Sequence, residues 1–328
     1  MKKVNKKKQK KLRKTYLIFL ILMTGIFLTS STYAWFTVNR IVSIDSLNVR
    51  VEAQGGLEIS SDGRYFKSYV TGDELVTARD TYTRISNQLP SKLEPVSTGG
   101  VLEKGRLMLY YGSVTNNING DYVLNAERAN ETSGSDGVFL AFDIFLKTTK
   151  DSYLYLTNES SVKYVGDKIP GIENATRLAF LEEGTTVATS SLDVVQSLNN
   201  ASDNDVYIWE PNYDVHNAYG IKHAAEVYNI TVNNSNNAPV KYDGIISNIS
   251  NIPVSSANAS NYPNYFKTVN VNVLTEANNT SNKQLFYLKA GITKVRVYIW
   301  IEGQDVDCED YSSVGNLDFK FQFSTNPS

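Results

Sequence analysis

The stretch that decides the fold is Val295-Arg296-Val297-Tyr298-Ile299-Trp300-Ile301-Glu302, near the end of the 328-residue chain. Aliphatic side chains occupy every second position, and arginine, aromatic and glutamate side chains stand between them. A period of two is that of a β-strand with one face on a hydrophobic core and the other in water. The pattern therefore predicts a half-buried strand over residues 295–302.

The same alternation occurs in three other stretches, and a further stretch is apolar throughout. The alternating stretches are 47–52, 269–273 and 317–323. Residues 138–146 are apolar on both faces, as in the central strand of a sheet. A turn-like spacer separates this strand from residues 153–157, so we expect the two to form a hairpin.

Helical signals are few. Residues 72–83 and 219–228 each have the composition of a short helix. Four tracts rich in Asn and Ser predict exposed loops: 116–120, 197–205, 233–237 and 255–264. We therefore expect an all-β protein, in which residues 35–328 form a single elaborated antiparallel β-sandwich that is jelly-roll-like and has long loops. Two stacked sandwiches are the alternative.

The beginning of the chain has the layout of a secretory signal peptide. A lysine-rich run precedes the apolar tract Tyr16–Leu28, and the small residues Thr32 and Ala34 follow at the expected cleavage site. The tract is shorter than the roughly 20 residues that span a bilayer. An uncleaved hydrophobic anchor reaching Phe36 is the alternative. Either way we expect residues 35–328 to be exported and to meet a signal peptidase, with membrane contact only through the amino-terminal segment.

The charge of the chain is distributed unevenly. Nine of the 32 basic side chains fall in the first 14 residues, so removal of residues 1–34 leaves 23 basic against 34 acidic groups, a net charge of −11. Such a surface disfavours nucleic acid as a partner, because phosphate binding needs positive charge. Cys308 is the only cysteine, which excludes a disulfide framework and a cysteine-based structural zinc site.

The segment Ser31-Thr32-Tyr33-Ala34-Trp35-Phe36-Thr37 resembles the end of signal peptides that the SipW signal peptidase handles in Gram-positive bacteria. Together with the strand and Gly-Gly turn that follow, it is similar to the amino-terminal region of the TasA/camelysin family of secreted biofilm-matrix proteins. The specific resemblance covers about residues 14–60 and is architectural beyond them. It implies a secreted, β-rich surface or matrix protein.

In that family, fibres are described as growing by donor-strand exchange, in which the first strand of one subunit completes the sandwich of the next. The resemblance implies that residues 35–52 carry this strand and that copies of the chain, or other surface proteins, are the partners. Trp35 and Phe36 would be aromatic anchors, and Leu47, Val49 and Val51 would fill the partner's core. The alternative is that this segment is the first strand of its own sandwich.

Camelysin has been described as a metallopeptidase, so the resemblance also raises hydrolysis. The His-Glu-x-x-His motif of such enzymes is absent; the chain has only His216 and His223, seven residues apart, with Glu226 nearby. We expect both histidines to be exposed in loops. No Gly-x-Ser-x-Gly elbow occurs either. We therefore expect a non-catalytic protein.

An acidic turn follows the strand at 295–302. It contains Glu302, Asp305, Asp307, Glu309 and Asp310, and carboxylates at this density suit Ca²⁺. The spacing differs from that of an EF-hand loop, so we expect a solvated turn without a resident cofactor and keep Ca²⁺ as the alternative.

A second function class is a monomeric extracellular adhesin. Trp209 and a tyrosine-rich surface offer apolar ring faces on which sugars stack, although a tryptophan in a sandwich more often belongs to the core. Our expectation is a secreted or cell-surface structural protein, with a carbohydrate-binding module as the alternative and a metallopeptidase after both.

Overall fold

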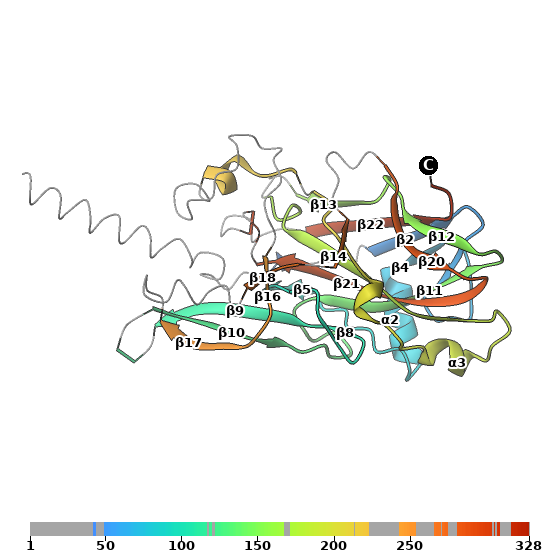
Figure 1. Cartoon of the computed structure of the whole chain (residues 1–328), viewed down its shortest axis with the longest axis horizontal. Helices are drawn as coiled ribbons and strands as arrows, with labels where there is room; N and C mark the ends of the chain where they lie inside the picture. Colours follow the sequence, from blue (N-terminus) through green and yellow to red (C-terminus); the bar gives the residue numbers. More distant parts are fainter. Residues whose placement is uncertain are drawn as a thin grey trace, which may run out of the picture.

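The structure is a computed structural model that describes residues 42–43, 49–116, 118–119, 122–166, 171–212, 214–222, 243–253, 266–269, 271–274, 281–303, 305, 307–308 and 316–327. The described part is mainly β-structure (Figure 1). Within the described residues, two large sheets pack against each other, several small sheets surround them, and short helices complete the secondary structure.

The first large sheet has seven strands, six of them in the order β19–β15–β14–β21–β11–β3, with β6 beside one end of β21. Their bounds are β3 Glu58–Ser60, β6 Pro95–Val96, β11 Leu140–Thr148, β14 Thr176–Thr186, β15 Val206–Trp209, β19 Asn272–Leu274 and β21 Gly291–Glu302. β21 contains residues 295–302, for which the sequence predicts a half-buried strand, and it lies in the middle of this sheet.

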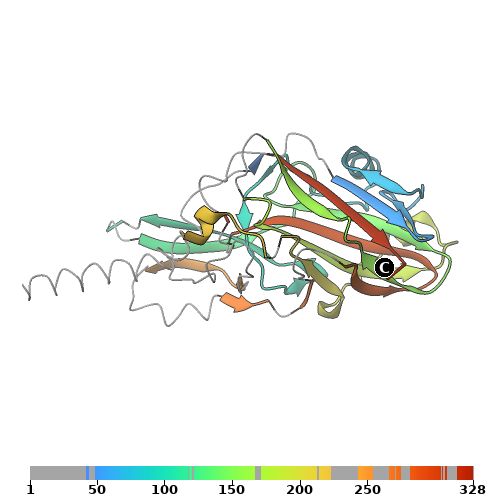
Figure 2. The same cartoon turned by 90° about the horizontal axis from the view of Figure 1, so that it is seen from above.

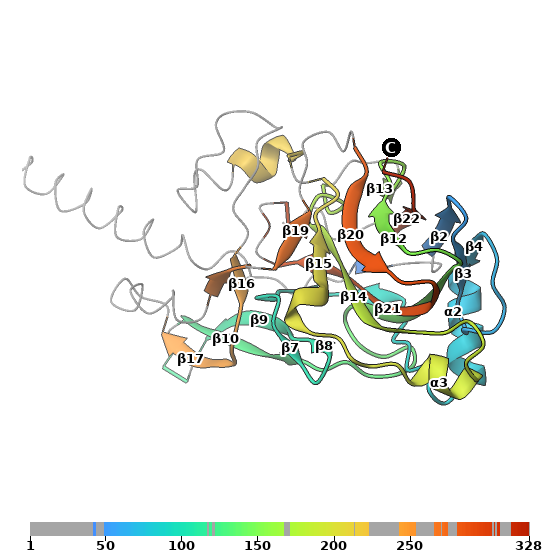
Figure 3. The same cartoon turned by 45° about the vertical axis from the view of Figure 1, so that its right-hand side comes forward.

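The second large sheet has six strands, five of them in the order β20–β12–β22–β2–β4, with β13 also paired to β22. Their bounds are β2 Val49–Gln54, β4 Tyr69–Thr71, β12 Ser152–Leu156, β13 Ser161–Val165, β20 Lys283–Leu288 and β22 Asn316–Ser324. Figure 3 shows these strands gathered on one side of β14 and β21.

Smaller elements flank the sandwich. β9 (Leu109–Asn116), β10 (Tyr122–Ala129) and β17 (Ile249–Pro253) form a three-stranded sheet that extends past one end of it (Figure 2). The two-stranded pairs are β1 (Val42–Ser43) with β5 (Lys92–Leu93), β7 (Leu102–Glu103) with β8 (Arg106–Leu107), and β16 (Asp243–Ile245) with β18 (Phe266–Thr268). The described helical segments are α2 (Gly72–Thr81), α3 (Leu192–Ser197), the 3₁₀ turn η2 (Asp203–Asp205) and residues 218–222.

The main core lies between the two large sheets. β22 contributes the inward row Leu317, Phe319, Phe321 and Phe323, all fully buried, as its alternation predicts. The ring of Phe180 on β14 packs edge-on against Phe321 and Phe323, with centroid separations of 6.3 and 5.5 Å. These contacts join the two large sheets across a shared core, and the expectation of a mainly β protein is confirmed.

The sheets are mixed, so the prediction of a purely antiparallel sandwich is wrong in this respect. β2 runs parallel to β22, β15 parallel to β19, and β21 parallel to β6. Each parallel pair joins strands that are distant in sequence, such as the start and the end of the chain for β2 and β22. Alternation sets which face is buried but carries no information on strand direction.

The predicted hairpin of residues 138–146 with 153–157 is also wrong. β11 pairs with β21 on one edge and β3 on the other, whereas β12 belongs to the second sheet and pairs with β20 and β22. Because both edges of β11 are occupied, the short connection carries the chain from one layer to the other. The central position predicted for this strand is confirmed.

β21 differs from its prediction in burial. All twelve of its residues are buried, including those on the face assigned to water. On that face Tyr298 and Trp300 pack with Phe139, Leu109 and Val206 in a second hydrophobic cluster. Strands and loops outside the two large sheets therefore cover this face of the seven-stranded sheet. Large aromatic side chains and polar groups are both buried beneath them.

Two local predictions have mixed outcomes. α2 confirms the first predicted helix, and its Glu74 side chain accepts a hydrogen bond of 3.0 Å from the Thr71 N–H, which caps the amino-terminal turn. Residues 218–222 are helical, and the rest of the second predicted helix lies outside the described residues. Of the stripe 269–273, only residues 272 and 273 belong to a strand, β19, whereas Val269 and Val271 lie outside the strands. Among the described residues, no helix has the length and apolar character needed to cross a bilayer.

Candidate functional site

The strand to which the sequence assigns a role in assembly is β2. Its six residues pair in parallel with Phe319–Ser324 of β22, and its other edge pairs with β4. Val51 is fully buried in the main core and Ala53 is nearly so. The structure thus places β2 in the sandwich of its own chain, which is the alternative raised from the sequence.

β2 is an interior strand of its sheet and lies between β22 and β4. Gln322 Nε2 donates a 2.7 Å hydrogen bond to Glu52 on its outer face, and Arg50 there is exposed. Gly55 and Gly56 follow directly, with φ of +70° and +84°. These left-handed conformations favour glycine and turn the chain from the second sheet toward β3 in the first.

The remaining residues predicted for assembly and export are not described. Thr32, Ala34, Trp35, Phe36 and Leu47 lie outside the described residues, and for Val49 only the backbone pairing is given. Their proposed roles stay predictions.

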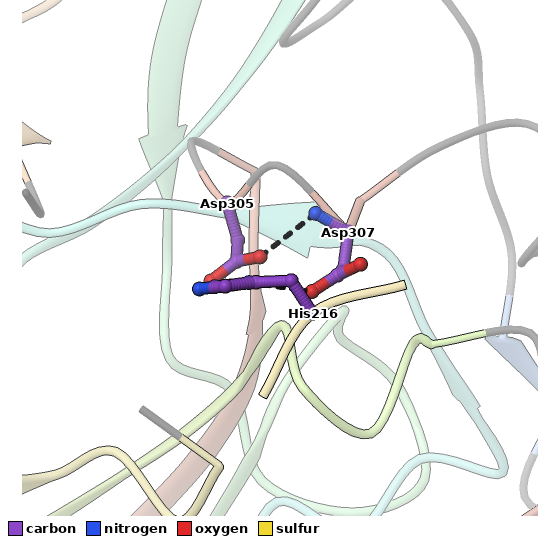
Figure 4. Close-up of side chains that lie close together, drawn as sticks. All are labelled: His216, Asp305 and Asp307. Carbon is purple, nitrogen blue, oxygen red and sulfur yellow. Dashed lines mark hydrogen bonds and ion pairs between the residues drawn. The ribbon is translucent and has the colours of Figure 1, made fainter. Parts of the chain in front are cut away.

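The acidic turn after β21 contributes to a second candidate site (Figure 4). Asp305 and Asp307 lie beside His216, which comes from the loop after β15, and one ligand atom from each lies within 4.8 Å of the others. The Nδ1 atom of His216 forms a 2.8 Å hydrogen bond with Asp307 Oδ2. The backbone N–H of Asp307 donates to Asp305 Oδ1, also at 2.8 Å.

Burial overturns two predictions at this place. The side chains of His216, Asp305 and Asp307 are only 3, 4 and 0% exposed, so the prediction of exposure is wrong for His216 and for these two described acids of the turn. Glu302 is fully buried as well and accepts a 3.0 Å hydrogen bond from Trp300 Nε1. The sequence showed a dense run of acids, but not the histidine from the loop after β15 or the arginine from β14 that the fold brings to them.

Arg177 on β14 supplies the compensating charge. Its guanidinium contacts Asp305 Oδ2 at 2.5 Å and Glu210 Oε1 at 3.2 Å, and both partners are almost fully buried. Burial works against the charged guanidinium, but the surrounding carboxylates outweigh it and raise the pKa of Arg177. Burial also raises the pKa of Asp307 to about 6, with repulsion from Asp305 in the same direction and the hydrogen bond from His216 opposing it.

The donor set defines what this cluster can bind. Two carboxylates and one imidazole suit a first-row divalent ion better than Ca²⁺, which takes six to eight oxygen ligands. However, Arg177 and His216 already engage the carboxylate oxygens that would face an ion. The described geometry is that of a charge-compensated cluster that joins the loop after β15 to the turn after β21. His223, Glu226, Glu309 and Asp310 lie outside the described residues.

The sequence offered Trp209 and surface tyrosines as ring faces for a sugar, and the structure places these residues differently. Trp209 is fully buried at the end of β15 and offers no ring face to a ligand. On the outer face of the six-stranded sheet, Tyr153 and Tyr287 are cross-strand partners, 47 and 44% exposed. Their rings meet edge-on with centroids 5.1 Å apart.

The sequence reading missed a buried ionic cluster on the covered face of the seven-stranded sheet. Asp143 on β11, Glu183 on β14, and Lys294 and Arg296 on β21 meet there with at most 3% exposure. The available signal was a charged residue inside a stretch that is otherwise apolar on both faces, as Asp143 is within 138–146.

Comparison with known proteins yields no relative. No protein-family model matches the chain, and no curated protein and no solved structure matches it.

Proposed function

We propose that this chain is an exported, non-catalytic structural protein of the cell surface or extracellular matrix, and that it assembles by exchanging its amino-terminal strand between copies. The observation that supports the proposal is the position of β2, which is the first of the long strands, runs parallel to the last strand, and is followed by two glycines in left-handed conformations. The resemblance of residues 14–60 to TasA/camelysin proteins also implies exchange of the amino-terminal strand.

The physical basis is that exchange preserves the native contacts. Withdrawal of β2 exposes backbone groups on β22 and β4 and uncovers the core around Phe321. An unpaired edge of this kind is a template for another strand, and β2 of a second copy carries the matching side chains. Rotation at Gly55 and Gly56 is the local change that lets β2 leave, so the remainder of the sandwich can stay folded.

The test is a reversible lock on β2. Arg50 and Lys320 are register partners in the parallel pair and their side chains lie on the outer face. Neighbouring strands about 4.8 Å apart are within the Cα separation that a disulfide accepts. We expect the R50C/K320C variant of the exported protein to stay monomeric when oxidised and to form filaments after reduction, seen by negative-stain microscopy and light scattering.

The matched control is R50C alone, which has the same surface change but cannot close the lock within one chain. Cys308, the only native cysteine, is buried and does not compete. Filaments of equal yield from the oxidised and reduced double variant would refute exchange of β2, and monomers under every condition would refute assembly.

A second candidate is an adhesin that binds a glycan, favoured by the exposed pair Tyr153 and Tyr287. Asp151 lies beside the pair, since its carboxylate accepts a 3.4 Å hydrogen bond from the Tyr287 hydroxyl. Ring faces flanked by a carboxylate suit a sugar, which is apolar on its faces and polar at its rim. Glycan-array binding by monomer that is lost in Y153A/Y287A, but retained in Y111A, would favour this candidate.

A further inference from the structure

The buried ionic cluster on the covered face of the seven-stranded sheet contains a lysine between two carboxyl groups. Lys294 projects from β21, which lies between β14 and β11 (Figure 1). Its Nζ atom is 3.0 Å from Glu183 Oε2 on β14 and 3.2 Å from Asp143 Oδ2 on β11. The lysine side chain is 3% exposed and both acid side chains are 0% exposed.

The backbone directs Glu183 toward this lysine. The register of β14 against β21 shifts between Glu182 and Gly184, so Glu183 is the extra residue of a β-bulge. Alternation along β14 places Glu183 on the covered face of the sheet, the same face as Ala179 and Leu181 of the second hydrophobic cluster. The bulge leaves Glu183 without a register partner of its own, next to the Gly184–Lys294 pair.

Two arginines orient the carboxyl groups. Arg106 Nη1 donates a 2.7 Å hydrogen bond to Glu183 Oε1, and Arg296 Nη1 donates a 2.6 Å hydrogen bond to Asp143 Oδ1. Each acid therefore has one oxygen held by a guanidinium and the other facing the amine. The two facing oxygens form ion pairs with Lys294 Nζ, which also donates hydrogen bonds of 3.1 and 3.0 Å to the carbonyl oxygens of Gln196 and Leu198.

The two acids have different proton affinities. Burial, followed by repulsion from Asp143, raises the pKa of Glu183. Burial also acts to raise the pKa of Asp143, but Arg296 and Lys294 outweigh it and lower that pKa. Of the two acids, Glu183 therefore holds a proton more readily and Asp143 stays ionised more readily, so Asp143 is the carboxylate that is open to a proton from the amine.

We propose that Lys294 and Glu183 condense to form an amide bond that cross-links β21 to β14. Asp143 takes a proton from the Lys294 ammonium, and the free amine attacks Cδ of the Glu183 carboxylic acid. Arg106 stabilises the negative charge that develops on Oε1. The Oε2 hydroxyl receives the next nitrogen proton, relayed by Asp143, and leaves as water. Asp143 ends protonated, and no oxidant or cofactor takes part.

The site provides what this reaction needs. Lys294 Nζ lies 3.0 Å from Glu183 Oε2, and both side chains are held by neighbouring strands of the sheet, which replaces a bimolecular encounter by a positioned one. The surroundings exclude bulk water, so the product amide is protected from hydrolysis. The bond would join two central strands of the sheet, and the inference is independent of whether β2 exchanges.

The test is mass spectrometry of the purified full chain under denaturing conditions. We expect the protein to be lighter than its sequence by the mass of one water molecule. Tryptic digestion is expected to release a branched peptide in which Lys294 is joined to Glu183, with no cleavage after Lys294. Fragmentation of that peptide locates the bond.

The control is K294R, which keeps the buried positive charge but lacks the amine that attacks. It separates the cross-link from dehydration at Asp-Gly sequences such as Asp62-Gly63, which would persist in this variant. D143N is expected to reduce the cross-linked fraction by removing the base. Linear, unmodified peptides containing Lys294 and Glu183 from wild-type protein would overturn the proposal, as would a branch at Asp143.

Discussion

Removal of the Arg296 guanidinium is expected to destabilise the sandwich strongly. This fully buried group makes hydrogen bonds of 2.6 Å to Asp143 and Glu131 and of 3.1 Å to the Ser86 carbonyl. Arg296→Met keeps most of the side-chain volume but leaves Asp143 and Glu131 without the guanidinium that they contact. Breaking a buried ion pair from one side costs about 3–5 kcal/mol, because the remaining charge stays desolvated.

The matched control is Lys147→Met in the same sheet. Its partner Glu58 is 2.7 Å away, but the two side chains are 32 and 48% exposed, so water takes over from the lost ion pair. The expected cost is about 0–1 kcal/mol. With a slope of about 3 kcal/mol/M for a chain of this size, the urea midpoint should fall by about 1 M or more in R296M and hardly move in K147M. Equal midpoints for the two variants would refute the view that the cluster is a desolvated ion network.

Three further predictions concern other parts of the fold. The pKa of Asp307 is raised to about 6, so between pH 4 and 6 the folded state binds more protons than the unfolded state. As the pH rises from 4 to 6, the free energy of unfolding of the wild type should therefore fall relative to that of D307N, by up to about 3 kcal/mol. Urea unfolding at several pH values measures this difference, and a rise in relative stability over the same interval would contradict it. Phe321→Ala should lower the free energy of unfolding by about 3–5 kcal/mol through a cavity between the sheets, and a loss below about 1 kcal/mol would show that this core collapses around the gap. Gly291→Ala should destabilise more than Gly134→Ala, because both have positive φ but only at Gly291 would a Cβ lie 2.2 Å from the Thr186 carbonyl oxygen; equal melting temperatures would contradict the clash.

The sequence was informative wherever a strand had one wet and one dry face. Residues 317–323 alternate between phenylalanine or leucine and polar side chains, and β22 buries the predicted row. The helix at 72–81 was also recognisable, because its cap depends on residues close in sequence. Such features are local, and local patterns are what a single sequence records.

The sequence misled where burial extended to both faces. In β21 the arginine, tyrosine and tryptophan positions suggested solvent, yet they support a second core and an ion network. Long amphipathic side chains fit either environment, so their types alone do not distinguish water from a partner layer.

In the candidate sites, too, the sequence shows individual residues and the tertiary structure decides which of them meet. The run of acids after β21 was visible in the sequence, and so was the strand that enters the sandwich as β2. Only the tertiary structure brought His216 and Arg177 to the acids, and only the pairing of β14, β21 and β11 set Lys294 between Glu183 and Asp143. Alternation along a strand is a local property set by the geometry of the backbone, whereas the choice of neighbouring strands depends on contacts between residues more than a hundred positions apart.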